Sequence, residues 1–247
     1  MSYNRKRMAI ERFVLQVCGW AVGIPLEILV LVALLRGGYR RYPVVFFYLI
    51  AIFVTTLVDI PIRAQSLLTR DAAVLRHAAR VYWVNEWILQ VLIFATVLSL
   101  IDLAISVSRW RRVMRSGLAA GALLFAGITF WIQYRPAPVS FGVWMTPWTR
   151  DLSFCAAILD LALWMILIAS RKSDRRLLLI CGALGMQFTA EAIGAAIANL
   201  SMAHTVEALA LSGSVLAMAG NLLCLYVWWQ TFRGVREPHL APTFTTP

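Results

Sequence analysis

The sequence predicts an all-α, polytopic membrane protein built as a seven-transmembrane-helix bundle. Three observations predict this fold class. Hydrophobic residues make up 61% of the 247 residues. They gather in seven apolar blocks of about 20 residues, which is the length that crosses the hydrocarbon core of a bilayer as a helix. Short arginine clusters separate many of the blocks, and few charged residues lie inside them, as is typical of polytopic membrane proteins.

The predicted spans cover residues 13–35, 42–62, 82–106, 116–134, 148–169, 177–198 and 206–230. A basic segment precedes the first span, but this span is longer than the apolar part of a signal peptide and no small-residue cleavage site follows it. We therefore expect one transmembrane domain over residues 1–233. The tail, residues 234–247, is rich in proline and threonine, and we expect it to be disordered in the cytoplasm.

Two connections between the predicted spans are longer than the others. In residues 63–81, arginines alternate with an apolar stripe that predicts an amphipathic helix lying in the membrane interface; the stripe consists of Leu67, Leu68, Val74, Leu75 and Ala78. Residues 135–147 contain three prolines, at positions 136, 138 and 147, which favour an irregular loop.

Orientation is predicted from the shortest loops, because Lys and Arg in short loops stay in the cytoplasm. Residues 36–41, 109–115 and 171–176 are the basic short loops, with three, four and four Lys or Arg. An odd number of spans places the termini on opposite sides. We therefore expect the N-terminus outside and the C-terminus in the cytoplasm, although the basic residues before position 13 argue for the reverse.

Small and aromatic residues predict how the helices pack. Ala190, Gly194 and Ala198 repeat at every fourth position of the sixth span, and such a stripe lets helices approach closely. Packing within the bundle explains this stripe better than a homodimer seam. Tryptophans near the span ends, including Trp131 and Trp148, are predicted to belong to the aromatic belts at the two interfaces.

Several function classes are excluded by what the spans lack. The net charge of +11 comes from clusters at the block ends, so it predicts contact with anionic lipid and not with nucleic acid. Lys6 and Lys172 both lie at membrane edges, so a retinal Schiff base has no lysine inside the bundle. The three histidines and four separate cysteines form no haem, zinc or disulfide pattern. We expect no cofactor and no enzymatic activity.

Carboxylates inside the spans are the candidate functional residues, because charged groups in a bilayer are costly and usually functional. Glu86 shares a helical face with Gln90 in the third span, and Glu191 shares one with Gln187 in the sixth. Asp160 lies roughly 18 Å into the fifth span, near the midplane. No Lys, Arg or His lies in any span interior. These five residues are the predicted ligand-binding site.

Other acids have different surroundings in the sequence. Glu27 lies on one stripe of the first span with Gln16, Trp20 and Gly23, and we expect this stripe to face the bundle interior. Helix-end pairing, solvation or the helix dipole explains the acids at span ends, which are Asp59, Asp102, Asp151 and Glu207.

Two interpretations of the buried acids stay open. In the first, each acid is protonated or hydrogen-bonded and holds helices together. In the second, Glu86, Glu191 and Asp160 line a polar pocket that opens outward and accepts a proton, a small cation or an amine.

Three segments resemble a group of uncharacterised seven-span inner-membrane proteins common in soil bacteria, notably acidobacteria. They are Arg40-Arg41-Tyr42-Pro43, Tyr82-Trp83 with Glu86, and residues 182–191. The motifs are short, and the likeness covers most of the chain. It implies a bacterial inner-membrane protein and no particular activity. Glu86 and Glu191 match positions of the group's pattern.

The function expected from these features is that of a sensor or accessory module. Such a module would lie in the lipid bilayer, bind a small ligand or a membrane partner subunit, and need no nucleic acid. A small proton- or cation-coupled secondary transporter is the first alternative, since acids near the midplane can couple ions to substrate movement. A structural subunit of a membrane complex is the second.

Overall fold

The structure is a computed structural model that describes residues 2–68, 72–104, 111–133, 141–169, 174–204 and 207–234. In these residues it contains no strand. It has seven α-helices and one short π-helical segment: α1 (Ser2–Ala33), η1 (Leu34–Gly38), α2 (Pro43–Leu68), α3 (Ala72–Ala104), α4 (Arg111–Gln133), α5 (Phe141–Ala169), α6 (Arg175–His204) and α7 (Glu207–Arg233). Each predicted span overlaps one of these helices.

Five stretches of helix in the described residues are long and apolar enough to cross a membrane. They are Val14–Gly38, Pro43–Ile62, Ala79–Ala104, Arg175–Ile197 and Leu211–Arg233. Helix α4 contributes a shorter apolar stretch, Ala120–Ile132. The protein is therefore an all-helical bundle of the membrane type.

The two long connections differ from their predictions. The separate interfacial helix over residues 63–81 is wrong, because residues 63–68 continue α2 and residues 72–81 form the first turns of α3. The predicted loop over 135–147 is wrong in part, because α5 already begins at Phe141. Residues 134–140 lie outside the described residues. So do residues 235–247, on which most of the predicted disordered tail falls.

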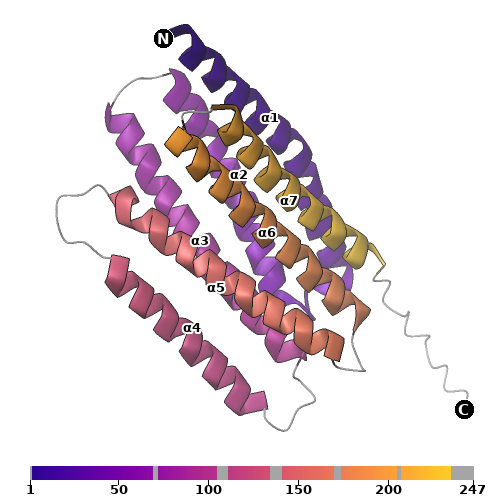
Figure 1. Ribbon diagram of the computed structural model, residues 1–247. Helices are drawn as coiled ribbons and strands as arrows, with labels where there is room; N and C mark the ends of the chain where they lie inside the picture. Colours follow the sequence, from indigo (N-terminus) through magenta and orange to yellow (C-terminus); the bar gives the residue numbers. More distant parts are fainter. Residues whose placement is uncertain are drawn as a thin grey trace, which may run out of the picture.

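The helices lie side by side in one bundle, with α2 and α3 partly behind the others in the view of Figure 1. Helices α6 and α7 pack closely, and α1 lies against α7 and α2. Helix α3 contacts α2 and α5, while α4 lies at the edge against α5 and α3. The largest fully buried side chains include Trp228, Tyr48 and Phe232. The indole N–H of Trp228 donates to the Ile180 carbonyl at 3.2 Å, which joins α7 to α6.

The close contact of α6 and α7 depends on small residues. Ala190 and Gly194 of α6 face Gly220, Gly213 and Ala217 of α7. This confirms that the small-residue stripe serves packing within the bundle at these two positions, while the side chain of Ala198 lies outside the described ones. Small side chains let the two backbones approach, so dispersion contacts hold helices together where lipid provides no hydrophobic driving force.

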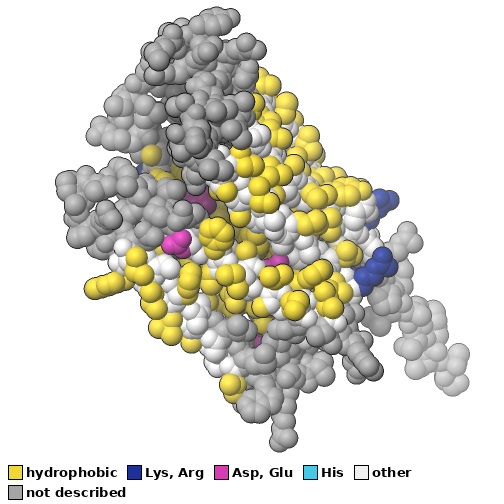
Figure 2. Space-filling view, in the orientation of Figure 1, with side chains coloured by type: hydrophobic (Ala, Val, Ile, Leu, Met, Phe, Trp, Pro, Cys, Tyr) yellow, Lys and Arg dark blue, Asp and Glu magenta, His cyan; other side chains and the backbone are white. Residues whose placement is uncertain are grey.

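The surface is apolar over much of the described part of the chain (Figure 2). Large hydrophobic side chains such as Leu123, Trp131 and Ile158 are more than half exposed. A water-soluble protein rarely exposes so much contiguous apolar surface. In a bilayer these side chains contact lipid tails, which agrees with the membrane character of the five long helices.

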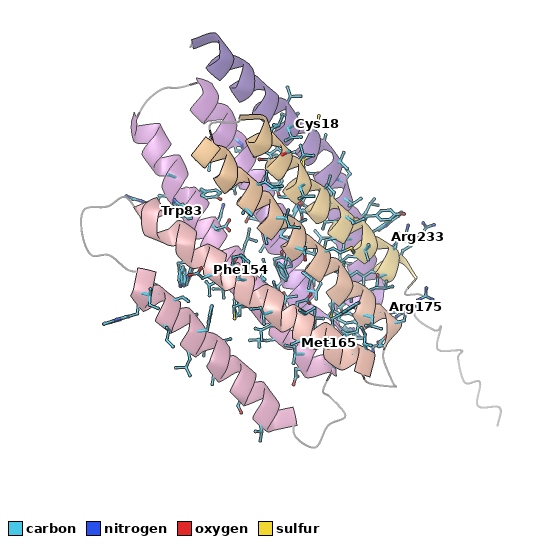
Figure 3. All side chains as sticks on the ribbon, in the orientation of Figure 1. Cys18, Trp83, Phe154, Met165, Arg175 and Arg233 are labelled. Atoms are coloured by element: carbon cyan, nitrogen blue, oxygen red, sulfur yellow. The ribbon has the colours of Figure 1, made fainter. Side chains whose placement is uncertain are left out.

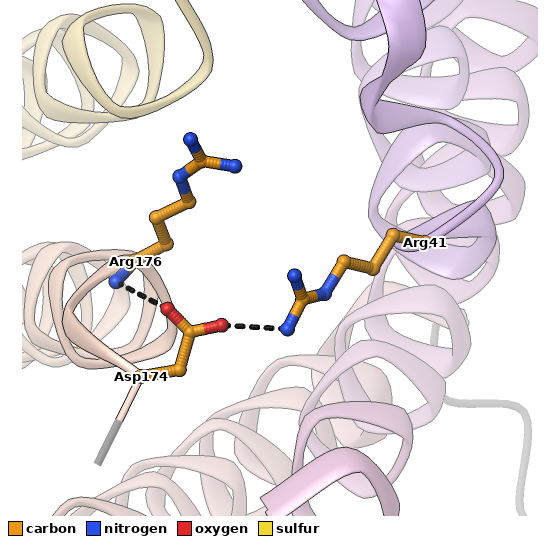
Figure 4. Close-up of polar contacts among 3 residues, drawn as sticks. All are labelled: Arg41, Asp174 and Arg176. Atoms are coloured by element: carbon orange, nitrogen blue, oxygen red, sulfur yellow. Dashed lines mark hydrogen bonds and ion pairs between the residues drawn. The ribbon is translucent and has the colours of Figure 1, made fainter. Parts of the chain in front are cut away.

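One end of the bundle is organised by the turn between α1 and α2. Gly37 has a φ of 138°, which glycine adopts without a Cβ penalty, and it ends the first helix. The ring of Tyr42 then packs edge-on against Phe232 at the end of α7, with centroids 5.7 Å apart. The Arg41 guanidinium pairs with Asp174, at the start of α6, with an N–O distance of 2.7 Å (Figure 4).

Six of the arginine side chains that the structure describes lie at this same end, at positions 36, 40, 41, 175, 176 and 233. Arg175 and Arg233 lie there together (Figure 3), and Arg36, Arg40 and Arg41 lie in or beside the turn just described. The start of α1 lies at the opposite end of the bundle from the end of α7 (Figure 1).

Asp174 has two roles that substitutions can separate. Its Oδ1 accepts the backbone N–H of Arg176 at 3.0 Å as the N-cap of α6, while Oδ2 pairs with Arg41. The pair is partly exposed, at 54% for Arg41 and 34% for Asp174, so we expect about 0.2–1 kcal/mol from it. Asp174→Asn should lose only this amount, since Asn caps well, whereas Asp174→Ala should lose about 1 kcal/mol more.

Thermal unfolding of the two variants and of Arg41→Gln in detergent measures this difference. Equal losses for Asp174→Asn and Asp174→Ala would show that the cap contributes nothing.

Candidate functional site

The five predicted site residues come from three neighbouring helices. Glu86 and Gln90 lie on α3, Asp160 on α5, and Gln187 and Glu191 on α6. Gln90, Asp160 and Gln187 are buried, and Glu86 and Glu191 are half-buried. All five therefore turn at least partly inward, as expected for polar side chains on helices that face lipid elsewhere.

The structure brings Glu86 and Glu191 together. Their carboxylates are close enough to interact electrostatically although they belong to α3 and α6. The Gln187 amide lies one turn before Glu191 and donates to its Oε1 at 2.9 Å. Glu191 lies roughly 24 Å along α6 from the arginine-rich end, at 1.5 Å per residue, and therefore beyond the middle of a 30 Å hydrocarbon core.

Tyr48 of α2 joins this group and was missed in the sequence. Its side chain is fully buried. A hydrogen bond joins its hydroxyl to the Gln187 side chain, and it interacts electrostatically with Glu191 and Glu86. The signal that could have found it is its position on the face of α2 that also carries the buried Val45 and Leu49. The polar cluster, defined as Tyr48, Glu86, Gln187 and Glu191, thus spans three helices.

Gln90 makes a different contact. Its amide donates to the Ser153 hydroxyl at 3.0 Å, which links α3 to α5. This contact explains the burial of Gln90 by helix packing, although the residue lies one turn from Glu86.

Asp160 lies where α5 crosses α6. A Cβ added at Gly185 would be 3.0 Å from its Oδ2, so the glycine provides the space for this carboxylate. Its Oδ1 is buried and has no hydrogen-bond partner among the described groups. Cys181 and Cys224 lie near Asp160, and Cys224 also lies near Glu191.

The polar cluster contains two carboxylates and no basic residue. Of the arginine side chains that the structure describes, those at positions 36, 40, 41, 175, 176 and 233 lie at one end of the bundle, and Arg80 lies on α3 six residues before Glu86. Within the described ranges, no group of three or more His, Cys, Asp or Glu could hold a metal ion. Two carboxylates can share a proton or accept one small cation, since placing both as free anions in low dielectric is costly.

No family model matches the chain, and no curated protein or solved structure matches it significantly. The chemistry of the cluster is therefore inferred from its own side chains. Carboxylate, amide and phenol oxygens supply hydrogen-bond acceptors, and the carboxylates supply negative charge, which are the partners that the N–H donors of ammonium or guanidinium groups require.

Proposed function

We propose that the chain is a non-enzymatic protein of the bacterial inner membrane that binds a small cation or amine at Glu86 and Glu191. It acts as a sensor or an accessory module, with signal passing through the helix ends to a partner. The observation that carries the proposal is that two carboxylates from separate helices, α3 and α6, lie near enough to interact electrostatically, with the Gln187 amide hydrogen-bonded to Glu191.

A cation between the carboxylates relieves an unfavourable arrangement. A carboxylate in low dielectric must be protonated or have its charge balanced by a cation. An opposite charge at about 4 Å is worth several kcal/mol at the effective dielectric of a protein. Tyr48 and Gln187 offer further polar atoms at the same place.

All seven helices cross the membrane in the proposed topology. Arg41 and Asp174 meet at one end of the bundle, and α2, α3, α4 and α5 lie between them in the chain. Two residues on the same side of a membrane are separated by an even number of crossings. With α2 and α3 counted as two crossings, α4 and α5 cross together or not at all. Trp148 of α5 donates to the Ala126 carbonyl of α4 at 3.3 Å, which supports α4 and α5 as an antiparallel transmembrane pair.

The arginine-rich end is cytoplasmic in this proposal. It holds residues 36–41, the start of α6 and the end of α7, and basic residues in short loops remain in the cytoplasm. The N-terminus then lies outside, and the polar cluster lies in the outer half of the bundle. The resemblance to seven-span proteins of soil bacteria supports the inner membrane as the location.

Binding to purified protein in lipid nanodiscs tests the site. We expect ammonium, methylammonium or guanidinium to raise the thermal midpoint of unfolding, because a ligand that binds only the folded state stabilises it. Glu86→Gln and Glu191→Gln should each weaken the apparent affinity at least about tenfold, or about 1.4 kcal/mol. The loss follows from removing one of two charges that hold the same cation.

Asp59→Asn is the matched control, since Asp59 is a half-buried carboxylate of α2 outside the cluster, and it should leave the affinity within about twofold. If none of the three cations shifts the midpoint, or if both Glu→Gln variants bind as well as the unaltered chain, the site does not exist and the structural-subunit alternative is favoured.

The same protein in liposomes distinguishes binding from transport. Accumulation of the bound cation in the liposomes under an imposed pH gradient would support the transporter in place of the sensor. Asp160 favours this alternative, because its Oδ1 is buried and has no hydrogen-bond partner among the described groups.

A further inference from the structure

A pocket of about 420 Å³ lies between α1, α2 and α7, apart from the polar cluster. Helices α1 and α7 run side by side along it (Figure 1). The lining groups that matter for the argument are Gln16, Trp20, Glu27, Thr56, Met218 and Asn221. None of the five predicted site residues lines it. Its volume is in the range of pockets that hold small organic ligands.

Two glycines on the pocket face of α1 let α7 pack closely against it. Gly19 and Gly23 lie on the face that also carries Gln16, Trp20 and Glu27. An added methyl group at Gly19 would meet the thioether of Met218. From Leu15 to Glu27 the lining of α1 extends about 18 Å along the helix axis, which makes the pocket long and narrow.

Glu27 is the group that the pocket leaves unsatisfied. Its side chain is only 3% exposed and lines the pocket. Oε1 accepts a long hydrogen bond of 3.4 Å from the Thr56 hydroxyl. Oε2 is buried and accepts no hydrogen bond from any described group. The residue lies near the middle of the Val14–Gly38 stretch, where a carboxyl without a partner costs most.

The rest of the lining has a defined chemistry. No Lys, Arg or His is among the residues that line the pocket. Trp20 offers an aromatic face, which attracts cations, and Met218 offers a polarisable thioether that packs well on aromatic rings. Asn221 adds an amide, which accepts a hydrogen bond through its oxygen.

We propose that this pocket binds a hydrophobic primary amine, with its ammonium group on Glu27 and its apolar body along Trp20 and Met218. An ammonium group supplies the donor that Oε2 lacks and the charge that the buried carboxylate requires. A neutral alcohol of the same shape supplies only one weak donor and no charge. The site is independent of Glu86 and Glu191, so either proposal can fail alone.

Labelling of Glu27 in the unaltered protein tests the proposal. A hydrophobic carbodiimide adds to a protonated carboxyl in an apolar pocket, and the O-acylisourea formed rearranges to an N-acylurea or is converted by an added amine to an amide with release of the urea. Mass spectrometry therefore scores protection as the fraction of peptide that carries neither product. Cleavage after Arg12 and Arg36 releases residues 13–36, a peptide in which Glu27 is the sole acid. We expect phenethylamine or hexylamine to protect this peptide at concentrations about 10- to 100-fold below phenylethanol or hexanol, as a charge-assisted hydrogen bond predicts.

The lipid of the nanodisc separates two sources of an ammonium group. In phosphatidylcholine alone, protection by the added amine shows that a free amine enters the pocket. Protection by phosphatidylethanolamine without added amine would show that a lipid headgroup supplies the same ammonium group. Both results support an ammonium site. Equal protection by amine and alcohol, or no labelling of the peptide under any condition, would overturn the proposal.

Glu27→Gln completes the test, because the amide keeps the shape and loses the charge. Calorimetric titration of this variant with phenethylamine should show a loss of at least about tenfold in affinity, while Asp174→Asn, which lies outside both proposed sites, should leave this affinity unchanged. Amine binding to Glu27→Gln at the affinity of the unaltered chain would contradict the assignment, whatever happens at the polar cluster.

Discussion

Replacement of Gly194 by alanine is expected to destabilise the bundle by about 1–3 kcal/mol or more, although it adds only one methyl group. A Cβ at this position would lie 2.5 Å from the carbonyl oxygen of Gly213. That oxygen belongs to the backbone of α7 and cannot move as a side-chain end can, so α6 and α7 must separate. Because this pair packs closely, the separation weakens dispersion attraction along much of the interface. The midpoint of thermal unfolding in detergent measures the effect.

Glycines of α4 provide the matched control. Gly117 and Gly121 have no atom within 4 Å of an added Cβ, so alanine there meets open space and should leave the midpoint unchanged or raise it, as helix propensity favours alanine by about 1 kcal/mol. Gly220→Ala should behave like Gly194→Ala, because its methyl would run into Ala190. A Gly194→Ala protein as stable as Gly121→Ala would mean that α6 and α7 do not approach as described.

The helices were predictable because lipid imposes a local rule. A segment in hydrocarbon must satisfy its backbone hydrogen bonds internally, so an apolar block of sufficient length becomes a helix. The ends of the helices were less predictable, because water at the membrane interface can also satisfy backbone hydrogen bonds and the rule no longer applies there. Residues 63–68 and 72–81 remain helical as continuations of α2 and α3. An amphipathic stripe does not distinguish such continuations from a separate helix lying in the interface.

The site depends on which helix faces meet, and that is a non-local property. The pattern of one helix places Gln187 and Glu191 together, but only the packing of α3 against α6 brings Glu86 to them. Tyr48 was missed because a tyrosine in an apolar block fits a lipid interface equally well. Trp148 shows the reverse error: it was predicted for the aromatic belt, yet it is buried against α4 and donates to Ala126.

The stripe of Glu27 was predicted correctly for a local reason. Gln16, Trp20, Gly23 and Glu27 repeat with the period of one helix, and all four line the pocket beside α7. The sequence showed that they share a face. It did not show that a cavity would lie there, since this depends on the side chains of α7.

Reporter fusions are expected to give an all-or-none result for the proposed topology. Alkaline phosphatase needs disulfide bonds and is active only outside the cytoplasm, whereas green fluorescent protein exported in unfolded form does not fluoresce there. A phosphatase fused after Gln133, at the end of α4, should be active, and one fused after Asp174 should be inactive. Green fluorescent protein should fluoresce after Arg233 and stay dark after Gln133.

The fusion after Gln133 decides whether α4 crosses the membrane, because α2 and α3 already return the chain to the side of the first loop. Arg41 and Asp174 are in contact, so fusions after residues 41 and 174 must give the same result and serve as the internal control. An inactive phosphatase after Gln133, together with an inactive one after Asp174, would reduce the bundle to five crossings. Active phosphatase at both positions 41 and 174 would show that the orientation is the reverse of the one proposed. The arginine-rich end would then face outward, contrary to the rule that basic short loops stay in the cytoplasm.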